Sequence, residues 1–255
     1  RDPFGRLIVN TLHKNNISSE LISYSDTKNT GFMMKGRVSA GDPEIFYFRK
    51  GSAASTLSRE DVEQIQFQNY NWIHLTGILP ALSETTRDAS FYLMEKAREN
   101  GLTISFDPNL RPQLWPDQET MISVVNSLAA KADYIFPGTA EGKILMGSSD
   151  PKEINDFYLK FGAKAVVTKC GSRGAYVSTP DGSFLSEGFR VEKVVDTVGA
   201  GDGFAAGTIY GLREGMSLAD AVRCGNAVGA LQVMNQGDNE GLPTTEKLKS
   251  FMNHQ

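Results

Sequence analysis

The chain has 255 residues, 22% of them charged and 40% hydrophobic, with a formal net charge of −4. Its Lys and Arg residues form no basic run, so we predict neither nucleic-acid binding nor anionic-membrane binding. Cys170 and Cys224 are far apart and lack a CxxC spacing, which argues against a disulfide framework or a zinc site and favours a reducing cytoplasm. No run of about 18 apolar residues occurs, so we expect no membrane span.

The first predicted elements are a helix, a short strand and a hairpin. Gly5–Asn15 has the apolar pattern of a helix, and Leu21–Ser25 has that of a short strand. Two further strand-like runs, Thr30–Val38 and Glu44–Arg49, flank the turn residues Ser39–Pro43. Such a Gly/Asp/Pro turn between two strand-like runs predicts a β-hairpin.

After the hairpin, apolar strands alternate with helices. The expected strands are Trp72–Leu75, Leu102–Phe106, Tyr134–Phe136 and Ala165–Thr168, and the expected helices are Thr85–Asn100, Thr120–Lys131 and Glu153–Phe161. Strands that are apolar throughout are typical of a parallel sheet covered by helices on both faces. Ligands of such sheets bind at the carboxyl ends of the strands, so the polar segments that follow the strands are the candidate site.

Residues 194–207, VVDTVGAGDGFAAG, form the most informative segment. We expect a helix to begin near Gly201 and to continue to Leu212. Small residues at its start leave successive backbone N–H groups uncovered, and together with the helix dipole these groups attract an anion. Asp202 lies in that first turn, where an aspartate is most often a helix cap. Beside a bound phosphate, it can instead accept the proton of an attacking hydroxyl.

Residues 201–206, GDGFAA, also fit the GxGxxA pattern of dinucleotide-binding turns. That pattern requires an acidic residue at the end of a second strand, whereas we expect Asp220 at the start of a helix. An aspartate inside the turn would also repel a pyrophosphate. We therefore disfavour NAD binding, and the lack of a GxxxxGK[ST] sequence excludes a P-loop kinase.

The sequence DTVGAGD, from Asp196 to Asp202, resembles the C-terminal signature D-T-x-G-A-G-D of the ribokinase-like (phosphofructokinase-B) family of carbohydrate kinases. The likeness extends over essentially the whole chain. It implies an α/β fold with a mostly parallel central sheet, helices on both faces and a small β lid. It also implies that Asp202 is the catalytic base and that Gly199, Ala200 and Gly201 supply the anion hole.

Within this family, the chain looks most like the kinases of 2-keto-3-deoxygluconate. The similar stretches are residues 47–53 (YFRKGSA), 106–111 (FDPNLR) and 237–243 (GDNEGLP). The resemblance implies that Tyr47, Arg49, Arg111 and Asp238 bind the sugar acid. Met33 or Phe32 stands where this subgroup usually offers a tyrosine, and Met33 is the candidate substrate residue. The two arginines suit a carboxylate, which a guanidinium can bind through two hydrogen bonds.

The resemblance also implies a nucleotide site and places for cations. The implied nucleotide-binding residues are Asn109, Lys169, Gly171, Ser172, Gly174 and Asn226. Residues 169–176 fit a hairpin turn equally well, and core packing is the ordinary role for Asn226. Mg²⁺ would arrive with ATP and need few protein ligands, with Glu141 as a candidate. Asp196 is a candidate for ordering a monovalent cation such as K⁺.

Three departures from the family pattern bear on the substrate. The family's N-terminal strand and Gly-Gly substrate loop do not occur in the 255 residues, so we expect residues before Arg1, and we expect the 255 residues alone to lack part of the sugar site. The Asn of the family's Asn-x-x-Glu motif is replaced by Gly138, although Glu141 remains. Met33 lacks the hydroxyl of the usual tyrosine.

We therefore expect an α/β kinase domain formed by residues 1–28 and 53–255, and a hairpin lid formed by residues 29–52. The expected reaction is phosphorylation of a primary hydroxyl of 2-keto-3-deoxygluconate by ATP. An exposed hairpin is only marginally stable alone, so we expect the lids of two subunits to pack into a homodimer. The alternatives are a fructokinase or other ketose kinase of the same family and a non-catalytic sugar- or nucleotide-binding regulator. An intact Asp202 argues against the regulator.

Overall fold

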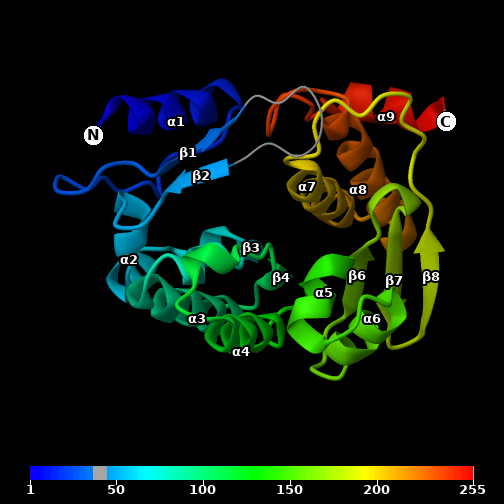
Figure 1. Cartoon of the computed structure of the whole chain (residues 1–255), viewed down its shortest axis with the longest axis horizontal. Coiled ribbons are helices and arrows are strands. Elements are labelled where there is room, and N and C mark those ends of the chain that lie inside the picture. The colour runs from blue at the N-terminus through cyan, green and yellow to red at the C-terminus, as the bar shows by residue number, and fades with distance from the viewer. Residues whose placement is uncertain (37–44, 255) are drawn as a thin grey trace. The chain divides into compact units, whose positions relative to one another are not determined.

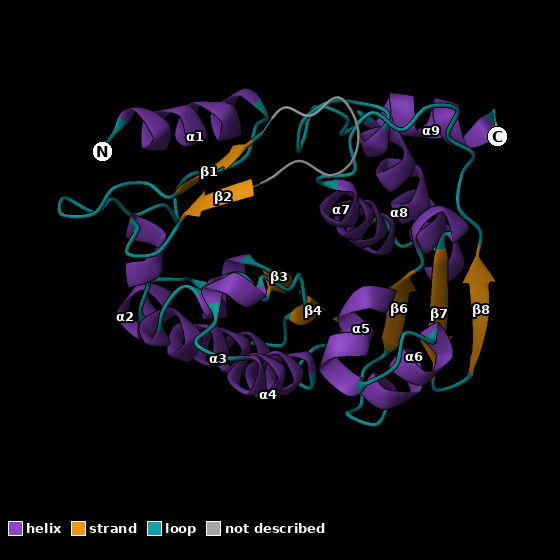
Figure 2. Ribbon diagram, in the orientation of Figure 1, coloured by secondary structure: helices purple, strands orange, loops and turns teal. Residues whose placement is uncertain are grey.

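The computed structural model describes residues 1–36 and 45–254 (Figure 1). Its helices are α1 (Pro3–Lys14), α2 (Arg59–Glu63), α3 (Glu84–Glu99), α4 (Gln118–Ala129), α5 (Thr139–Met146), α6 (Pro151–Leu159), α7 (Ala200–Arg213), α8 (Leu218–Val233) and α9 (Thr245–Asn253). Its strands are β1 (Phe32–Lys35), β2 (Ile45–Phe48), β3 (Trp72–Thr76), β4 (Thr103–Asp107), β5 (Tyr134–Ile135), β6 (Ala165–Lys169), β7 (Ala175–Thr179) and β8 (Gly182–Ser186) (Figure 2).

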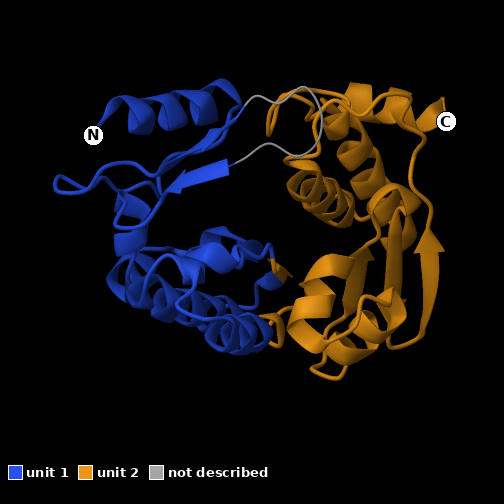
Figure 3. Cartoon of the chain, viewed as in Figure 1, with its two compact units in different colours: residues 1–104, 109–128 blue, residues 105–108, 129–255 orange. Residues whose placement is uncertain are grey.

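The chain forms two compact units (Figure 3). The first comprises Arg1–Ile104 and Asn109–Leu128, and the second comprises Ser105–Pro108 and Ala129–Gln255. The hairpin strands β1 and β2 belong to the first unit. The separation of a lid from a kinase domain therefore stays a prediction, because the two units divide the chain elsewhere.

The larger sheet has the strand order β3-β4-β5-β6-β7-β8. β4, β5 and β6 pair in parallel, as predicted, whereas β6, β7 and β8 form an antiparallel meander at one edge. The carboxyl ends of β4, β5 and β6 therefore lie along one edge of the second unit, where the sequence places polar residues.

One face of this sheet is covered by α7 and α8. Val167 of β6 and Val177 of β7 are fully buried there, in one cluster with Phe204 of α7 and Val222 of α8. Phe136, just after β5, meets Phe204 edge to face with ring centroids 6.4 Å apart. This packing fixes the first turns of α7 beside the carboxyl ends of β5 and β6.

The opposite face is covered by α6, which contacts the sheet through the buried side chain of Asn155. Its Nδ2 donates to the carbonyls of Val166 and Tyr176, at 3.1 and 3.0 Å. Nδ2 also lies 3.0 Å from Oγ of Ser178, and Oδ1 accepts a 2.6 Å bond from Oγ1 of Thr168. Because side chains alternate between the faces of a strand, Val166 and Thr168 face α6 while Val167 faces α7.

Three glycines spaced four residues apart, Gly203, Gly207 and Gly211, lie along the side of α7 that meets α8. A Cβ at Gly207 would come within 2.8 Å of Cγ2 of Val228 and of the carbonyl oxygen of Cys224. Glycine at this position therefore permits the close approach of the two helices. The glycines beyond the signature thus serve helix packing, which anchors the end of α7 that carries Asp202.

The first unit is built around α3, which packs against α2 and β3. β1 and β2 form the predicted antiparallel hairpin, with Phe32 opposite Phe48 and Met33 opposite Tyr47. The ring of Phe32 stacks between those of Phe4 in α1 and Phe48, with centroid distances of 5.1 and 4.7 Å. The aromatic stack packs α1 against the hairpin.

Most predicted elements are confirmed, with ends shifted by one to three residues. The predicted strand Leu21–Ser25 is wrong, because residues 22–25 are irregular and lie between a turn at residues 20–21 and a bend at residues 26–28. Ile22 N bonds to Ser19 O at 3.0 Å, and Oγ of Ser25 accepts from Lys28 N at 3.0 Å. Hydrogen bonds to nearby serines thus replace a strand ladder. α2, α5, α9 and β8 were not predicted, and the predicted turn Ser39–Pro43 lies outside the described residues.

No helix within residues 1–36 and 45–254 combines the length and the apolar composition that a membrane crossing needs.

Candidate active site

The anion loop, residues 196–202, leads directly into α7. Gly199 is the N-cap of α7 and has a left-handed backbone with φ of 78°. Its carbonyl accepts the first helical hydrogen bond, from Gly203 N at 2.8 Å. The N–H groups of the first turn have no acceptor within their own helix, so the loop offers donors to an anion.

Asp202 occupies the third position of α7 and is exposed. The N-cap is Gly199, so the ordinary interpretation of Asp202 as the helix cap does not apply. An exposed carboxylate in the first turn of the helix lies beside the N–H groups that would hold a phosphate. This arrangement suits a base that must reach a substrate hydroxyl.

A second loop, residues 237–238, packs against the anion loop. Asp196 links the two, because its Oδ1 accepts from Val198 N at 3.1 Å and its Oδ2 accepts from Gly237 N at 3.3 Å. The backbone of Asp238 lies against Gly199. The structure thus brings Asp196 and Asp238, two predicted site residues, to the loop that holds Asp202.

Lys169 ends β6 and forms an ion pair with Asp107, the last residue of β4, with Nζ 2.5 Å from Oδ2. A Cβ at Gly201 would lie 3.5 Å from the same Nζ. The predicted nucleotide-binding lysine therefore lies beside the N-terminus of α7. Asp107 was not predicted as a site residue, although a carboxylate at the end of a buried strand was the available signal.

Residues 171–174 form a tight turn between β6 and β7. Cys170 N bonds to Gly174 O at 2.8 Å, and Gly174 N bonds to Gly171 O at 3.0 Å. Gly174 has φ of 92°, and a Cβ there would come within 2.1 Å of the carbonyl oxygen of Ser186. The hairpin-turn interpretation is confirmed by the antiparallel pairing of β6 and β7. A role of Gly171, Ser172 and Gly174 in nucleotide binding stays a prediction.

Two other predicted residues have evident structural partners. Asn226 is buried in α8, and its Nδ2 donates to the carbonyls of Ser186 and Glu187 at 3.0 and 3.2 Å. Glu141 lies in the first turn of α5, where Oε2 accepts from Gly138 N at 2.7 Å. These contacts account for Asn226 as an anchor of β8 and for Glu141 as a cap of α5, and their ligand roles stay predictions.

Met33, Tyr47 and Arg49 come together on the hairpin of the first unit. Met33 and Tyr47 are opposite each other in the register. The guanidinium of Arg49 lies over the Tyr47 ring, 4.8 Å from its centroid, and Nη2 is 3.8 Å from Sδ of Met33. Three of the predicted substrate residues thus form one cluster.

The other predicted residues of the first unit follow β4. Arg111 is half-buried, and its Nη1 donates to its neighbour's carbonyl, Leu110 O, at 2.8 Å. Asn109 has a left-handed backbone with φ of 39°, which asparagine tolerates better than most residues.

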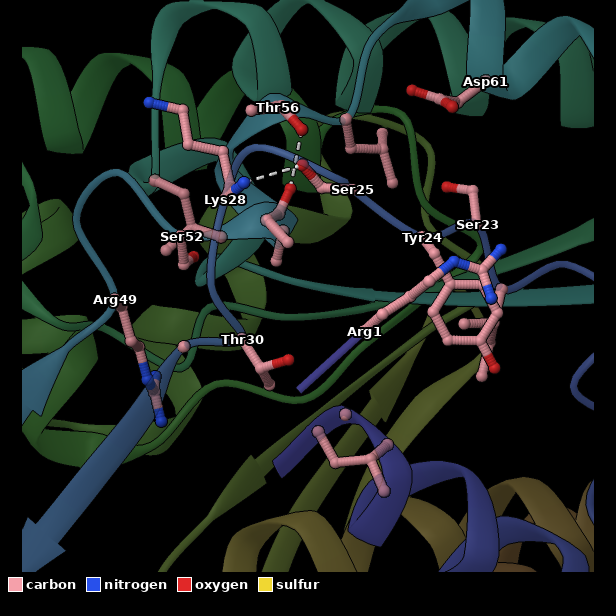
Figure 4. Close-up of a pocket in the computed structure, with 18 of the residues that line it drawn as sticks. Arg1, Ser23, Tyr24, Ser25, Lys28, Thr30, Arg49, Ser52, Thr56 and Asp61 are labelled. Atoms are coloured by element: carbon pink, nitrogen blue, oxygen red, sulfur yellow. Dashed lines mark hydrogen bonds between the residues drawn. The ribbon is translucent and has the colours of Figure 1, made fainter. Parts of the chain in front are cut away.

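A cavity of about 650 Å³ lies within the first unit (Figure 4). Arg49 lines it together with hydroxyl side chains that include Ser25, Thr30, Ser52 and Thr56. Of the predicted substrate residues that the structure describes, Arg49 alone lines this cavity. A guanidinium among hydroxyl groups offers hydrogen-bond donors to a polar, anionic ligand.

Dinucleotide binding is not supported by the position of Asp220. This residue lies in the first turn of α8, where its backbone N–H bonds to the N-cap hydroxyl of Ser217 at 3.2 Å. It is therefore not at the end of a strand, as the dinucleotide pattern requires. Within the described ranges, no group of three or more His, Cys, Asp and Glu side chains is arranged to hold a metal ion.

Comparison with known proteins gives a consistent result. The chain is 49% identical to the 2-dehydro-3-deoxygluconokinase of Bacillus subtilis (strain 168), over all of its own length and 79% of the relative's. A double mutant of the fructokinase from Vibrio cholerae O395, solved with fructose, ADP and potassium ion, has a TM-score of 0.89 and 27% identity over 99% of this chain and 82% of that one.

A putative ribokinase II from E. coli, solved with ATP and Mg²⁺, has a TM-score of 0.90 and 27% identity, over all of this chain and 81% of that one. The family model of the pfkB carbohydrate kinases matches residues 1–245. The anion loop, the sheet order and these matches agree, and the chain belongs to the pfkB family of carbohydrate kinases.

Proposed function

We propose that this chain transfers the γ-phosphoryl group of ATP to a primary hydroxyl of 2-keto-3-deoxygluconate, the sugar acid also called 2-dehydro-3-deoxygluconate. The observation that carries the proposal is the exposed carboxylate of Asp202 in the first turn of α7, beside the backbone N–H groups at the start of that helix. The name of the B. subtilis relative supports the choice of substrate.

In the proposed reaction, Asp202 accepts the proton of the substrate hydroxyl. The hydroxyl oxygen forms a bond to the γ-phosphorus while the bond from that phosphorus to the bridging oxygen of ADP breaks. Negative charge on the transferred group is stabilised by the N–H groups of Gly199, Ala200 and Gly201 and by the α7 dipole. Proton transfer of this kind contributes about 10²–10⁴-fold to a rate.

The sugar acid is proposed to bind through Arg49, Tyr47, Arg111 and Asp238. The stacking of Arg49 on Tyr47 holds the guanidinium plane in one orientation, which favours bidentate binding of a carboxylate. Met33 supplies an apolar contact within the same cluster. Arg111 and Asp238 are assigned by sequence likeness, and Asp238 is supported by its contact with the anion loop.

ATP and Mg²⁺ are proposed on the strength of the E. coli relative. Lys169 and the turn of residues 171–174 would hold the phosphates, and Asn109 and Asn226 are the further candidates. Mg²⁺ retains most of its waters and needs few protein ligands, so one carboxylate, Glu141, is compatible with it. K⁺ is proposed beside Asp196, because the potassium-bound fructokinase shares the fold.

A homodimer through the hairpin is proposed from the side chains that the hairpin exposes. Met34, Phe46 and Phe48 alternate onto one face and are 58%, 53% and 50% exposed. Three large apolar side chains on one small face lose contact with water when a second copy covers them. A lid at residues 29–52 that also excludes water from ATP is part of the same proposal.

A panel of three acceptors tests the substrate assignment. The purified protein is given MgATP with 2-keto-3-deoxygluconate, gluconate or fructose, and ADP release is measured. We expect a higher kcat/KM with the keto acid than with fructose, because Arg49 and Arg111 can bind a carboxylate, which fructose lacks. A preference for fructose would favour the ketose kinase. Nucleotide binding without turnover on any acceptor would favour the regulator or a sugar site that the 255 residues leave incomplete.

A further inference from the structure

Lys169 and Asp107 link two strands that are not neighbours in the sheet. β4 and β6 flank β5, so two strand spacings, about 9.5 Å, separate them. The Nζ of Lys169 nevertheless lies 2.5 Å from Oδ2 of Asp107. The long lysine side chain therefore crosses the carboxyl end of β5 to reach the carboxylate.

The backbone holds both ends of this link. Lys169 N donates to Pro137 O at 2.8 Å, and Phe136 N donates to Phe106 O, one residue before Asp107, at 2.9 Å. The side chain of Asp107 is 2% exposed, whereas that of Lys169 is 20% exposed. The buried carboxylate is therefore the fixed end of the pair, and the ammonium is the end within reach of a ligand.

The ammonium lies beside the first turn of α7. Lys169 shares a sheet face with Val167, which packs in the cluster with Phe204 of α7, and Nζ is 3.5 Å from where a Cβ of Gly201 would be. Burial alone would lower the pKa of Lys169, but the charges of Asp107, Glu141 and Asp202 outweigh burial and raise this pKa. The side chain is therefore cationic at neutral pH.

We propose that Asp107 is a positioning residue that holds the Lys169 ammonium against the N-terminus of α7, so that a nucleotide phosphate meets a fixed positive charge as well as backbone N–H groups. The inference rests on the proposed phosphate-binding role of this loop. One bond to Asp107 uses one of the three N–H donors of an ammonium, so the same group can also donate to a phosphate oxygen.

A positioning role and a purely electrostatic role of Asp107 predict opposite effects on nucleotide affinity when the carboxylate is removed. If the carboxylate acted only through its charge, its removal would strengthen the binding of a phosphate anion. If it holds Lys169 in place, its removal weakens binding, because a flexible lysine must then lose side-chain freedom when the nucleotide binds. Weaker nucleotide binding after removal of the carboxylate therefore indicates positioning, and stronger binding indicates an effect of charge alone.

The test measures MgADP affinity by calorimetry for the wild type, Asp107→Asn, Lys169→Met and the double variant. We expect Lys169→Met to weaken binding about 10- to 100-fold, as for a lost hydrogen bond to a charged group. We expect Asp107→Asn to weaken binding about threefold or more, and to have no effect in the Lys169→Met background, because coupled residues are not additive.

A matched control is Asp133, which lies at the amino ends of the strands, whereas Asp107 and Lys169 lie at the carboxyl ends. Asp133 is buried and pairs with Lys164 at 3.4 Å, next to the amino ends of β5 and β6. Asp133→Asn removes a similarly buried carboxylate far along the strands from α7. We expect it to lower the melting temperature and to leave MgADP affinity unchanged.

Several outcomes would overturn the proposal. They are an Asp107→Asn variant that binds MgADP as tightly as the wild type or more tightly, additive effects of the two substitutions, and an equal loss of affinity in Asp133→Asn. Lys169→Met leaves a buried carboxylate without its partner and can unfold the protein. In that case, the MgADP affinities of Asp107→Asn and Asp133→Asn are compared, and a loss confined to Asp107→Asn supports the positioning role.

The calorimetry contains no sugar acceptor. Its result for Asp107 is therefore independent of whether the substrate assignment is correct. A wild type that binds MgADP but does not phosphorylate 2-keto-3-deoxygluconate would refute the substrate assignment and leave the test of Asp107 intact. In the active protein, the positioning role also predicts a higher KM for ATP in Asp107→Asn with an unchanged KM for the sugar.

Discussion

The backbone of Gly199 lies directly against the carbonyl oxygen of Asp238, which a Cβ atom at position 199 would approach to 2.1 Å. Gly199 also has φ of 78°, a conformation that other residues rarely adopt. Two independent constraints thus require glycine at the start of α7, and both concern the loop that presents Asp202.

Gly199→Ala is expected to destabilise the protein and to lower its kinase activity. The new Cβ would push the loop of residues 237–238 away, and the strained backbone alone costs about 1–3 kcal/mol. Gly201→Ala is the matched control, because its Cβ would be 3.5 Å from Lys169 Nζ, an ordinary contact. Alanine inside a helix is favoured over glycine by up to about 1 kcal/mol.

Urea unfolding and steady-state kinetics on both variants test this difference. Gly199→Ala should lose both stability and turnover, whereas Gly201→Ala should retain its stability. Equal losses of stability in the two variants would contradict the role assigned to the Gly199–Asp238 contact.

Asp202→Asn is expected to lower kcat by about 10²–10⁴-fold, the range for removal of a general base. MgADP affinity should stay within a few-fold of the wild type, because the backbone N–H groups remain. Asp220→Asn is the control, since Asp220 occupies the same position in the first turn of α8. Near-normal turnover of Asp202→Asn, or a similar loss in Asp220→Asn, would refute the assignment of the base.

The N-terminus of α1 is expected to loosen in acid. Oδ1 of Asp2 accepts from Gly5 N at 2.8 Å, and Oδ2 accepts from Thr30 N at 2.7 Å. These bonds, that from Thr30 first, lower the pKa of Asp2 from 3.8 to about 2. A lowered pKa means that the stabilisation is fully present above pH 3.8 and is lost as the pH falls through 2.

Hydrogen exchange of the Gly5 and Thr30 amides measures this effect, after correction for the intrinsic pH dependence of exchange. Protection should decline between pH 3.8 and 2 in the wild type. Asp2→Asn, whose side chain has a single acceptor oxygen, should show reduced protection of one or both amides already at neutral pH. Protection that is unchanged in Asp2→Asn would contradict the role of this carboxylate.

Met34→Glu and Phe46→Glu are each expected to weaken the proposed dimer. Each places a charge on the apolar face of the hairpin, where a second copy would bury it without a partner. Gln64→Glu adds the same charge at an exposed position outside residues 29–52 and should not change the assembly. Sedimentation velocity at micromolar concentration is the measurement, and a wild type that sediments only as a monomer would refute the dimer.

The sequence predicted the elements whose signals are local. The start of α7, the apolar strands and the two hairpin strands follow from glycine, periodicity and turn residues within a few positions of one another. The strand predicted at Leu21–Ser25 is wrong, and at its end the Ser25 side chain accepts hydrogen bonds from the backbone of Thr27 and Lys28. α5 was missed because its first turn, at Gly138, looked like the polar end of a strand.

The sequence by itself determined that an anion site begins α7 and that Asp202 lies within it, because adjacent residues specify both. Only the tertiary structure decided which side chains meet that site. Lys169 and Asp107 are 62 positions apart, and their pairing depends on the order of β4, β5 and β6. The contact of Gly199 with Asp238 likewise depends on how a distant loop folds back. No local pattern encodes such contacts, because they arise from packing elements that the sequence separates.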